Sequence, residues 1–79
     1  MYLGDAIACR IENLCKERGI SINRLALLSG LTQSTIDSIL KGKSKSPRLV
    51  TLIKICDGLG ITVAEFLDDP SINDADIED

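Results

Sequence analysis

Polar side chains recur at helical spacing between residues 33 and 41, and their types suit hydrogen bonding to the edges of nucleic-acid bases. They are Gln33, Ser34, Asp37, Ser38 and Lys41. On a helix they fall on the side opposite Ile36, Ile39 and Leu40. A glutamine amide can bond the N6 and N7 edge of adenine, and a serine hydroxyl can serve several bases. An ordinary solvated helix would carry more Glu, Lys and Arg, so this arc predicts a surface that reads DNA.

Two short helices joined by a tight turn would position this arc. The stretch over residues 22–41 reads INRLALLSGLTQSTIDSILK. Gly30 suits the turn because glycine adopts positive φ without steric cost, and Thr32 can cap the second helix. Ala26 is small where two helices must cross closely. The pattern therefore predicts a helix-turn-helix.

The composition predicts one small all-α domain. The chain has 79 residues, 44% of them hydrophobic and only 3% aromatic, which favours an aliphatic core between packed helices. Apolar spacing, capping residues and glycines predict three further helices at about 5–18, 48–59 and 63–67. Cys15 and Cys56 fall on apolar faces as small hydrophobic residues, and Leu49 is expected on the inward face of its helix.

Charge divides the chain into two unlike parts. Residues 68–79 hold six acids and no base, whereas residues 1–67 hold all nine bases and the other six acids, a net charge of +3. A basic body is compatible with a polyanionic partner. We expect a DNA-binding domain over residues 1–69 and an acidic, mobile tail over residues 70–79.

Several function classes are disfavoured by what the sequence lacks. It has no histidine, its three cysteines form no CxxC pair, and it has no glycine-rich phosphate loop. We therefore expect no metal, no cofactor and no enzymatic activity. No apolar run approaches the roughly 18 residues that span a bilayer, and no signal peptide is visible, so the expected location is cytoplasmic with no membrane contact.

Residues 7–67 resemble the lambda-repressor-like helix-turn-helix family of phage repressors and Cro-type proteins. Three segments carry the resemblance, and they read RIENLCKERGIS, LALLSGLTQSTIDSILKGK and SPRLVTLIKICDGLGITVAEFL. The resemblance implies a compact five-helix fold in which the second helix of the pair lies in the major groove. The first helix of the pair would cross the phosphate backbone.

Carried over by position, the resemblance implies that Gln33, Ser34 and Ser38 read bases. Residues at a groove edge or phosphate would be Thr32, Ile22, Asn23, Lys43, Lys45, Ser46 and Arg48. Helix N-termini bind anions through unpaired amides, and cations hold flanking phosphates. Many relatives have glutamine at the position of Ile22, which here offers only its backbone N–H. Asp37 would be repelled by phosphates unless it accepts a bond from cytosine or within the protein.

These observations predict a sequence-specific transcriptional regulator, a repressor that binds an inverted repeat in double-stranded DNA as a homodimer. The resemblance places the dimer surface on the last helix, at Ile61, Val63, Phe66 and Leu67, although these side chains could equally complete the monomer core. The alternative is a protein-interaction module of the antitoxin or anti-repressor type. In that case the acidic tail would engage a basic surface on another protein.

Overall fold

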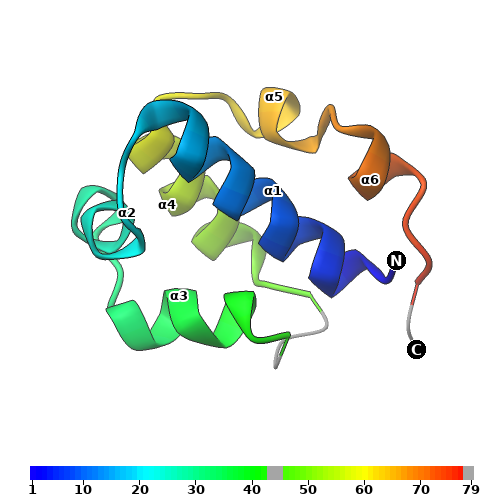
Figure 1. Ribbon diagram of the computed structural model, residues 1–79, viewed down its shortest axis with the longest axis horizontal. Helices are drawn as coiled ribbons and strands as arrows, with labels where there is room; N and C mark the ends of the chain where they lie inside the picture. The colour runs from blue at the N-terminus through cyan, green and yellow to red at the C-terminus, as the bar shows by residue number, and fades with distance from the viewer. Residues whose placement is uncertain (43–45, 78–79) are drawn as a thin grey trace.

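The computed structural model describes residues 1–42 and 46–77. In this part of the chain the structure has six helices (Figure 1). They are α1 (Leu3–Arg18), α2 (Ile22–Ser29), α3 (Gln33–Leu40), α4 (Leu49–Leu59), α5 (Val63–Leu67) and α6 (Pro70–Asn73). The predicted all-α fold is confirmed. No helix of the described residues is long and apolar enough to cross a membrane.

The ends of the helix pair are set by the residues that the sequence singled out. The Ser21 side chain accepts a hydrogen bond from the Arg24 amide at the start of α2, and Thr32 accepts one from Thr35 at the start of α3. Gly30 follows α2 with φ of 67°, in the left-handed region that favours glycine. The turn between α2 and α3 therefore has its expected chemistry.

One core receives side chains from each of the first five helices. The fully buried residues at its centre are Ile11 of α1, Leu25 of α2, Ile36 of α3, Ile55 of α4 and Phe66 of α5. Helix α2 packs on α4, whereas α1 packs on α3 and α6. In Figure 1, α1 crosses the front of the molecule, α4 passes behind it and α3 lies below. This arrangement leaves the outer side of α3 uncovered by other described helices.

Gly58 allows α2 and α4 to approach closely. A Cβ atom added at this position would clash with the Ser29 hydroxyl oxygen and lie 3.0 Å from the Ser29 backbone nitrogen and 3.1 Å from the carbonyl carbon of Leu28. Glycine inside a helix lowers stability by up to about 1 kcal/mol relative to alanine. At position 58 this cost is offset by the close packing of α4 against α2 that the missing side chain allows. The α2–α4 crossing holds the helix pair on the rest of the fold.

The prediction that the folded part ends at Pro70 is wrong. Residues 70–73 form α6, and the half-buried Ile72 packs against the core. Beyond α6, the Leu3 amide donates to the Asp76 carbonyl and the Asp76 amide donates to the Met1 carbonyl, both at 3.0 Å. The described part of the acidic segment is thus joined to the N-terminus, which lies beside it in Figure 1.

Two expected faces also need correction. Phe66, predicted on a dimer surface, is 0% exposed because it fills the centre of the monomer core. Ile61 and Val63 are half-buried against that core, which leaves Leu67, at 39% exposed, as the accessible member of the predicted set. Leu49, expected to face inward, is 63% exposed because it precedes the first inward position of α4, Leu52.

Candidate nucleic-acid interface

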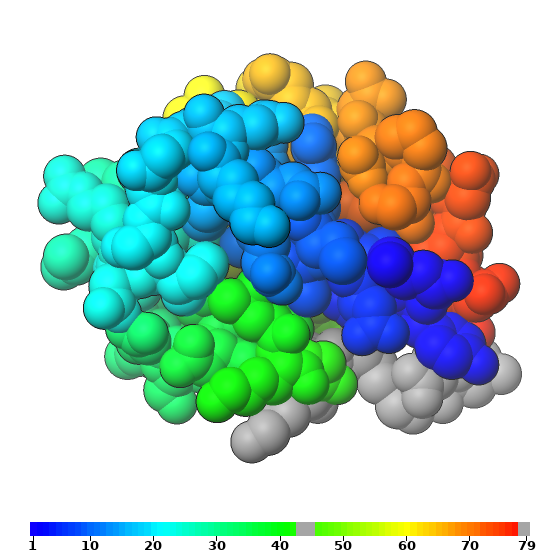
Figure 2. All heavy atoms as spheres, in the orientation of Figure 1, coloured from blue at the N-terminus to red at the C-terminus, as the bar shows by residue number. Residues whose placement is uncertain are grey.

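The outer side of α3 presents the side chains that the sequence predicted to read bases. Gln33 and Ser34 are exposed at the first two positions of α3, and Ser38 is half-buried one turn later. Ile36 and Ile39 point into the core and fix the rotation of the helix. Figure 2 shows α3 along the lower surface of the molecule, where a duplex could reach it. We refer to Gln33, Ser34 and Ser38 as the reading arc.

A groove between α2 and α3 ends at the reading arc. It is lined by Asn23, Ala26, Leu27, Leu31 and Gln33. Leu27 is 75% exposed, so a large apolar side chain lies in the same groove as the Gln33 amide. Apolar groups of this kind can pack on a thymine methyl next to a hydrogen-bonded base. Neither Leu27 nor Leu31 was predicted at this site. The signal for Leu27 was an apolar residue on α2 at a position that does not fit the spacing of the core residues.

A second groove, between α3 and α4, joins Ser38 to Arg48. Its other lining residues are Thr35, Ile39, Pro47 and Thr51. The Thr35 hydroxyl lies 2.9 Å from the Thr32 hydroxyl, which couples the cap of α3 to this groove. The fold therefore brings a base-reading candidate, a phosphate-binding candidate and two threonine hydroxyls to one place, although Thr35 and Thr51 were not expected there.

The first turn of α2 offers backbone amides to an anion. The Arg24 amide donates to the Ser21 hydroxyl and the Leu25 amide to the Ser21 carbonyl, both at 3.0 Å. Amides earlier in a helix have no partner within it, so those of Ile22 and Asn23 remain available. The helix dipole adds a partial positive charge at this end. Ile22 itself is half-buried against the core, consistent with a contact through its backbone alone.

The basic side chains fall into two groups, those that donate hydrogen bonds within the fold and those that are free to meet another molecule. Arg10 donates to the Phe66 and Glu65 carbonyls at 3.1 and 2.9 Å, and Arg18 donates to the Leu59 carbonyl at 3.0 Å. The remaining cations of the described part are exposed, namely Lys16, Arg24, Lys41, Arg48 and Lys54. The predicted contacts Lys43 and Lys45 lie outside the described residues, and the predicted contact Ser46 is exposed.

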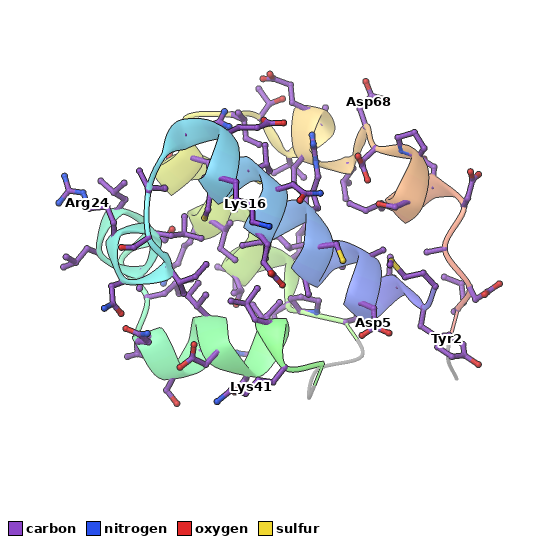
Figure 3. The ribbon with its side chains drawn as sticks, in the orientation of Figure 1. Tyr2, Asp5, Lys16, Arg24, Lys41 and Asp68 are labelled. Atoms are coloured by element: carbon purple, nitrogen blue, oxygen red, sulfur yellow. The ribbon has the colours of Figure 1, made fainter. Side chains whose placement is uncertain are left out.

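Arg24 and Lys41 extend the positive surface along the helix pair. Figure 3 shows Arg24 projecting into solvent from α2 and Lys41 from the end of α3. The sequence contains no acid between Glu17 and Asp37, so the positive charge of Arg24 on α2 has no counter-charge within that stretch of the chain. That gap in acidic residues was the signal by which Arg24 could have been found. A surface of this kind attracts a polyanion.

The buried Cys15 and Cys56 do not contribute to this surface. Burial raises the pKa of the Cys15 and Cys56 thiols above the ordinary value, which keeps them protonated at neutral pH and disfavours a nucleophilic role. In residues 1–42 and 46–77 no cluster of three His, Cys, Asp or Glu side chains could hold a metal ion. The chemistry of the site therefore rests on hydrogen bonds, apolar contacts and positive charge.

Comparison with known proteins places this arrangement among DNA-binding helix-turn-helix proteins. Residues 10–71 match the family described as Cro/C1-type HTH DNA-binding domain. The HTH-type transcriptional regulator PuuR of Escherichia coli K12 is 37% identical over 67 residues, which cover 85% of this chain and 36% of PuuR. The chain thus spans about a third of the length of this curated relative.

Solved structures agree with the sequence match. The crystal structure of prophage Lp1 protein 11 is similar with a TM-score of 0.82 at 38% identity, covering 92% of this chain and 97% of that one. An HTH_3 family transcriptional regulator from Vibrio cholerae is similar with a TM-score of 0.77 at 35% identity, covering 89% of this chain and 39% of that one. The family match over residues 10–71 includes the reading arc and the residues that line both grooves.

Proposed function

The chain belongs to the Cro/C1-type helix-turn-helix DNA-binding family, and from that premise we propose that it is a sequence-specific transcriptional repressor. It binds an inverted-repeat operator as a homodimer, with α3 in the major groove and α2 across the phosphate backbone. It is a binding protein rather than an enzyme, and it acts in the cytoplasm, where it meets DNA. The relatives named as transcriptional regulators support this assignment.

The observation that carries the proposal is the composition of the reading arc. An amide and two hydroxyls lie on the outer side of a rigid helix, with grooves at both ends of the arc. Gln33 matches the donor and acceptor pattern of adenine, while Ser34 and Ser38 can bond either base type. Backbone amides of α2 and the Arg48 side chain would hold phosphates on the two sides and set the register.

A homodimer supplies the specificity that one small domain lacks. One recognition helix covers only a few base pairs, too few to single out a genomic site. Two copies on half-sites about one helical turn apart, roughly 34 Å, double the number of bases that are read. An inverted repeat is the DNA symmetry that a two-fold dimer requires.

Selection from a random DNA library at physiological salt tests the proposal. We expect the bound pool to contain an enriched inverted repeat with half-sites about ten base pairs apart. The matched control replaces the reading arc by alanine at Gln33, Ser34 and Ser38, which should keep the melting temperature and lose the enrichment. A wild-type chain that enriches no sequence would contradict the proposal. Placing the selected repeat over a promoter that drives a reporter then separates repression from activation.

A further inference from the structure

Three large apolar side chains of α4 are exposed on one face of the helix. Leu49, Val50 and Ile53 have exposed fractions of 63%, 54% and 48%. Their spacing makes them neighbours on the helix surface, beside the inward residues Leu52, Ile55, Cys56 and Leu59. Single exposed apolar residues are common, but a contiguous group marks a contact surface. We call Leu49, Val50 and Ile53 the α4 patch.

The α4 patch lies next to the reading helix without covering it. Leu49 directly follows Arg48, which lines the same groove as Ser38 near the end of α3. A molecule docked on the α4 patch would therefore lie beside α3 and leave Gln33 and Ser34 open. Leu67 of α5 is placed differently, because α5 lies on the opposite side of the molecule from α3 (Figure 1). A copy docked over Leu67 would be remote from the reading arc.

The charges around the α4 patch suit a second copy of this chain. Lys54 and Asp57 follow the patch on the outer side of α4, and both are exposed. In a two-fold contact, residue i of one copy meets residue j of the other and j meets i. Each Lys54 can therefore face the partner's Asp57 in both halves of the interface. A strongly acidic or basic partner would instead leave one of these charges opposed by its own sign.

The small size of the α4 patch indicates a weak contact, which forms between free copies only at high concentration and which adjacent half-sites on DNA strengthen. The three exposed side chains offer on the order of 200–300 Å² of apolar surface per copy. A stable interface buries about 800 Å² per partner, so this contact is weak between two copies in solution. Adjacent half-sites raise the effective concentration of one copy near the other, which is enough to close a weak contact.

We propose that the α4 patch is the surface through which two copies of this chain assemble on neighbouring half-sites. This inference rests on the proposed DNA-binding function and replaces α5 by α4 as the dimer contact. The dimer surface predicted on α5 is incomplete, because Phe66 is buried in the core. The α4 patch, by contrast, is accessible and adjacent to α3, and the neighbouring Lys54 and Asp57 can pair with those of a second copy.

Neutral polar substitutions in the α4 patch provide the test. Val50→Ser and Ile53→Asn remove apolar contact without adding repulsion to phosphate, and Leu67→Asn is the matched control on α5. Binding is titrated on a duplex with one selected half-site and on one with the inverted repeat. We expect half-site affinity to stay within about twofold, and the cooperativity between half-sites to fall about tenfold in the two α4 variants only. Cooperativity that survives Ile53→Asn, or that Leu67→Asn removes, would overturn the proposal.

Charge reversal adds a second test. Lys54→Asp and Asp57→Lys should each weaken cooperativity, and the double variant should restore it if the two residues meet across the two-fold axis. Sedimentation of the free protein at millimolar concentration gives a readout without DNA. There the wild type should self-associate and Ile53→Asn should stay monomeric, whereas a monomeric wild type would overturn the inference. A wild type that self-associates but binds no half-site would contradict only the proposed function.

Discussion

The helix pair α2–α3 and the closing segment over residues 63–77 are ordered in different ways. In the pair, the caps bond across three residues, from Ser21 to Arg24 and from Thr32 to Thr35. In the closing segment, Arg10 reaches carbonyls 55 and 56 residues away, and it lies 3.8 Å from the Asp69 carboxylate. Hydrogen bonds between residues close in sequence order the helix pair. The closing segment is held by hydrogen bonds and an ion pair from α1, which is distant in sequence.

This difference indicates that the two regions can be perturbed separately. Both depend on the core, but only the pair faces the proposed DNA, and only the closing segment accepts the hydrogen bonds of Arg10. A lesion under α2 should therefore weaken both stability and DNA binding. A lesion at Arg10 should loosen the closing segment and leave the reading arc in place.

The largest effect is expected where α2 rests on α4. Gly58→Val places a branched side chain against the Ser29 hydroxyl and the backbone of Leu28, and neither can move without shifting α2. We expect a loss of about 3 kcal/mol in the free energy of unfolding, measured by urea denaturation followed by circular dichroism. Lys54→Val on the exposed side of α4 is the control for helix propensity and should change stability little. Equal effects of the two variants would show that the crossing has room for a side chain.

The reading arc should respond in affinity rather than in stability. Gln33→Ala should cost about 1–3 kcal/mol of binding on the selected operator and relax the preference at one base position. Arg48→Ala, at the other groove, should weaken binding to all sequences alike and reduce the salt dependence. Both are measured by fluorescence anisotropy over a series of salt concentrations. Exchanged outcomes would mean that Arg48 reads a base and Gln33 holds a phosphate.

Arg10 is expected to have a smaller effect, confined to the closing segment. Arg10→Ala leaves two carbonyls at the end of α5 without their donor and removes the Asp69 contact, at a cost of about 1–2 kcal/mol. In this variant, hydrogen exchange of the backbone amides that follow Phe66 should become faster. The affinity for a DNA half-site at low temperature should stay unchanged. Lys16→Ala, an exposed position on the same helix, is the control. Faster exchange in α2 and α3 would show that the two regions unfold together.

The contrast between regions also explains what the sequence could predict. Gly30, Thr32 and the apolar spacing of α3 identified the helix pair and its exposed arc because each signal acts within a few residues. The sequence did not predict the order of residues 70–77, because acidic composition says nothing of the bonds between Asp76 and the N-terminus. Local rules favour disorder for such a segment, and contacts distant in sequence override them.

Burial at single positions was harder to predict than helical structure. Phe66 appeared equally suited to a dimer surface or a core, and only the packing of α5 on α4 decides between them. The close approach at Gly58 could not be predicted either, because a glycine inside a helix indicates by itself only a low helix propensity. A helical pattern gives the side of a helix that is buried, but it does not identify the neighbour that covers it.

The smallest expected effect concerns a buried, unpaired hydroxyl group at the end of α2. The Ser29 hydroxyl is buried, with 8% of the residue exposed, and has no hydrogen-bond partner among the described residues. Ser29→Ala removes this unpaired group, so stability should stay unchanged or rise by up to about 1 kcal/mol. The same change should reduce the penalty of Gly58→Ala, because the hydroxyl is the nearest atom to the added methyl group. Urea denaturation of the two single variants and the double variant measures this coupling. If Ser29→Ala instead destabilises the protein, the hydroxyl contributes a stabilising contact to the native state, and only the backbone of Leu28 and Ser29 explains the glycine at position 58.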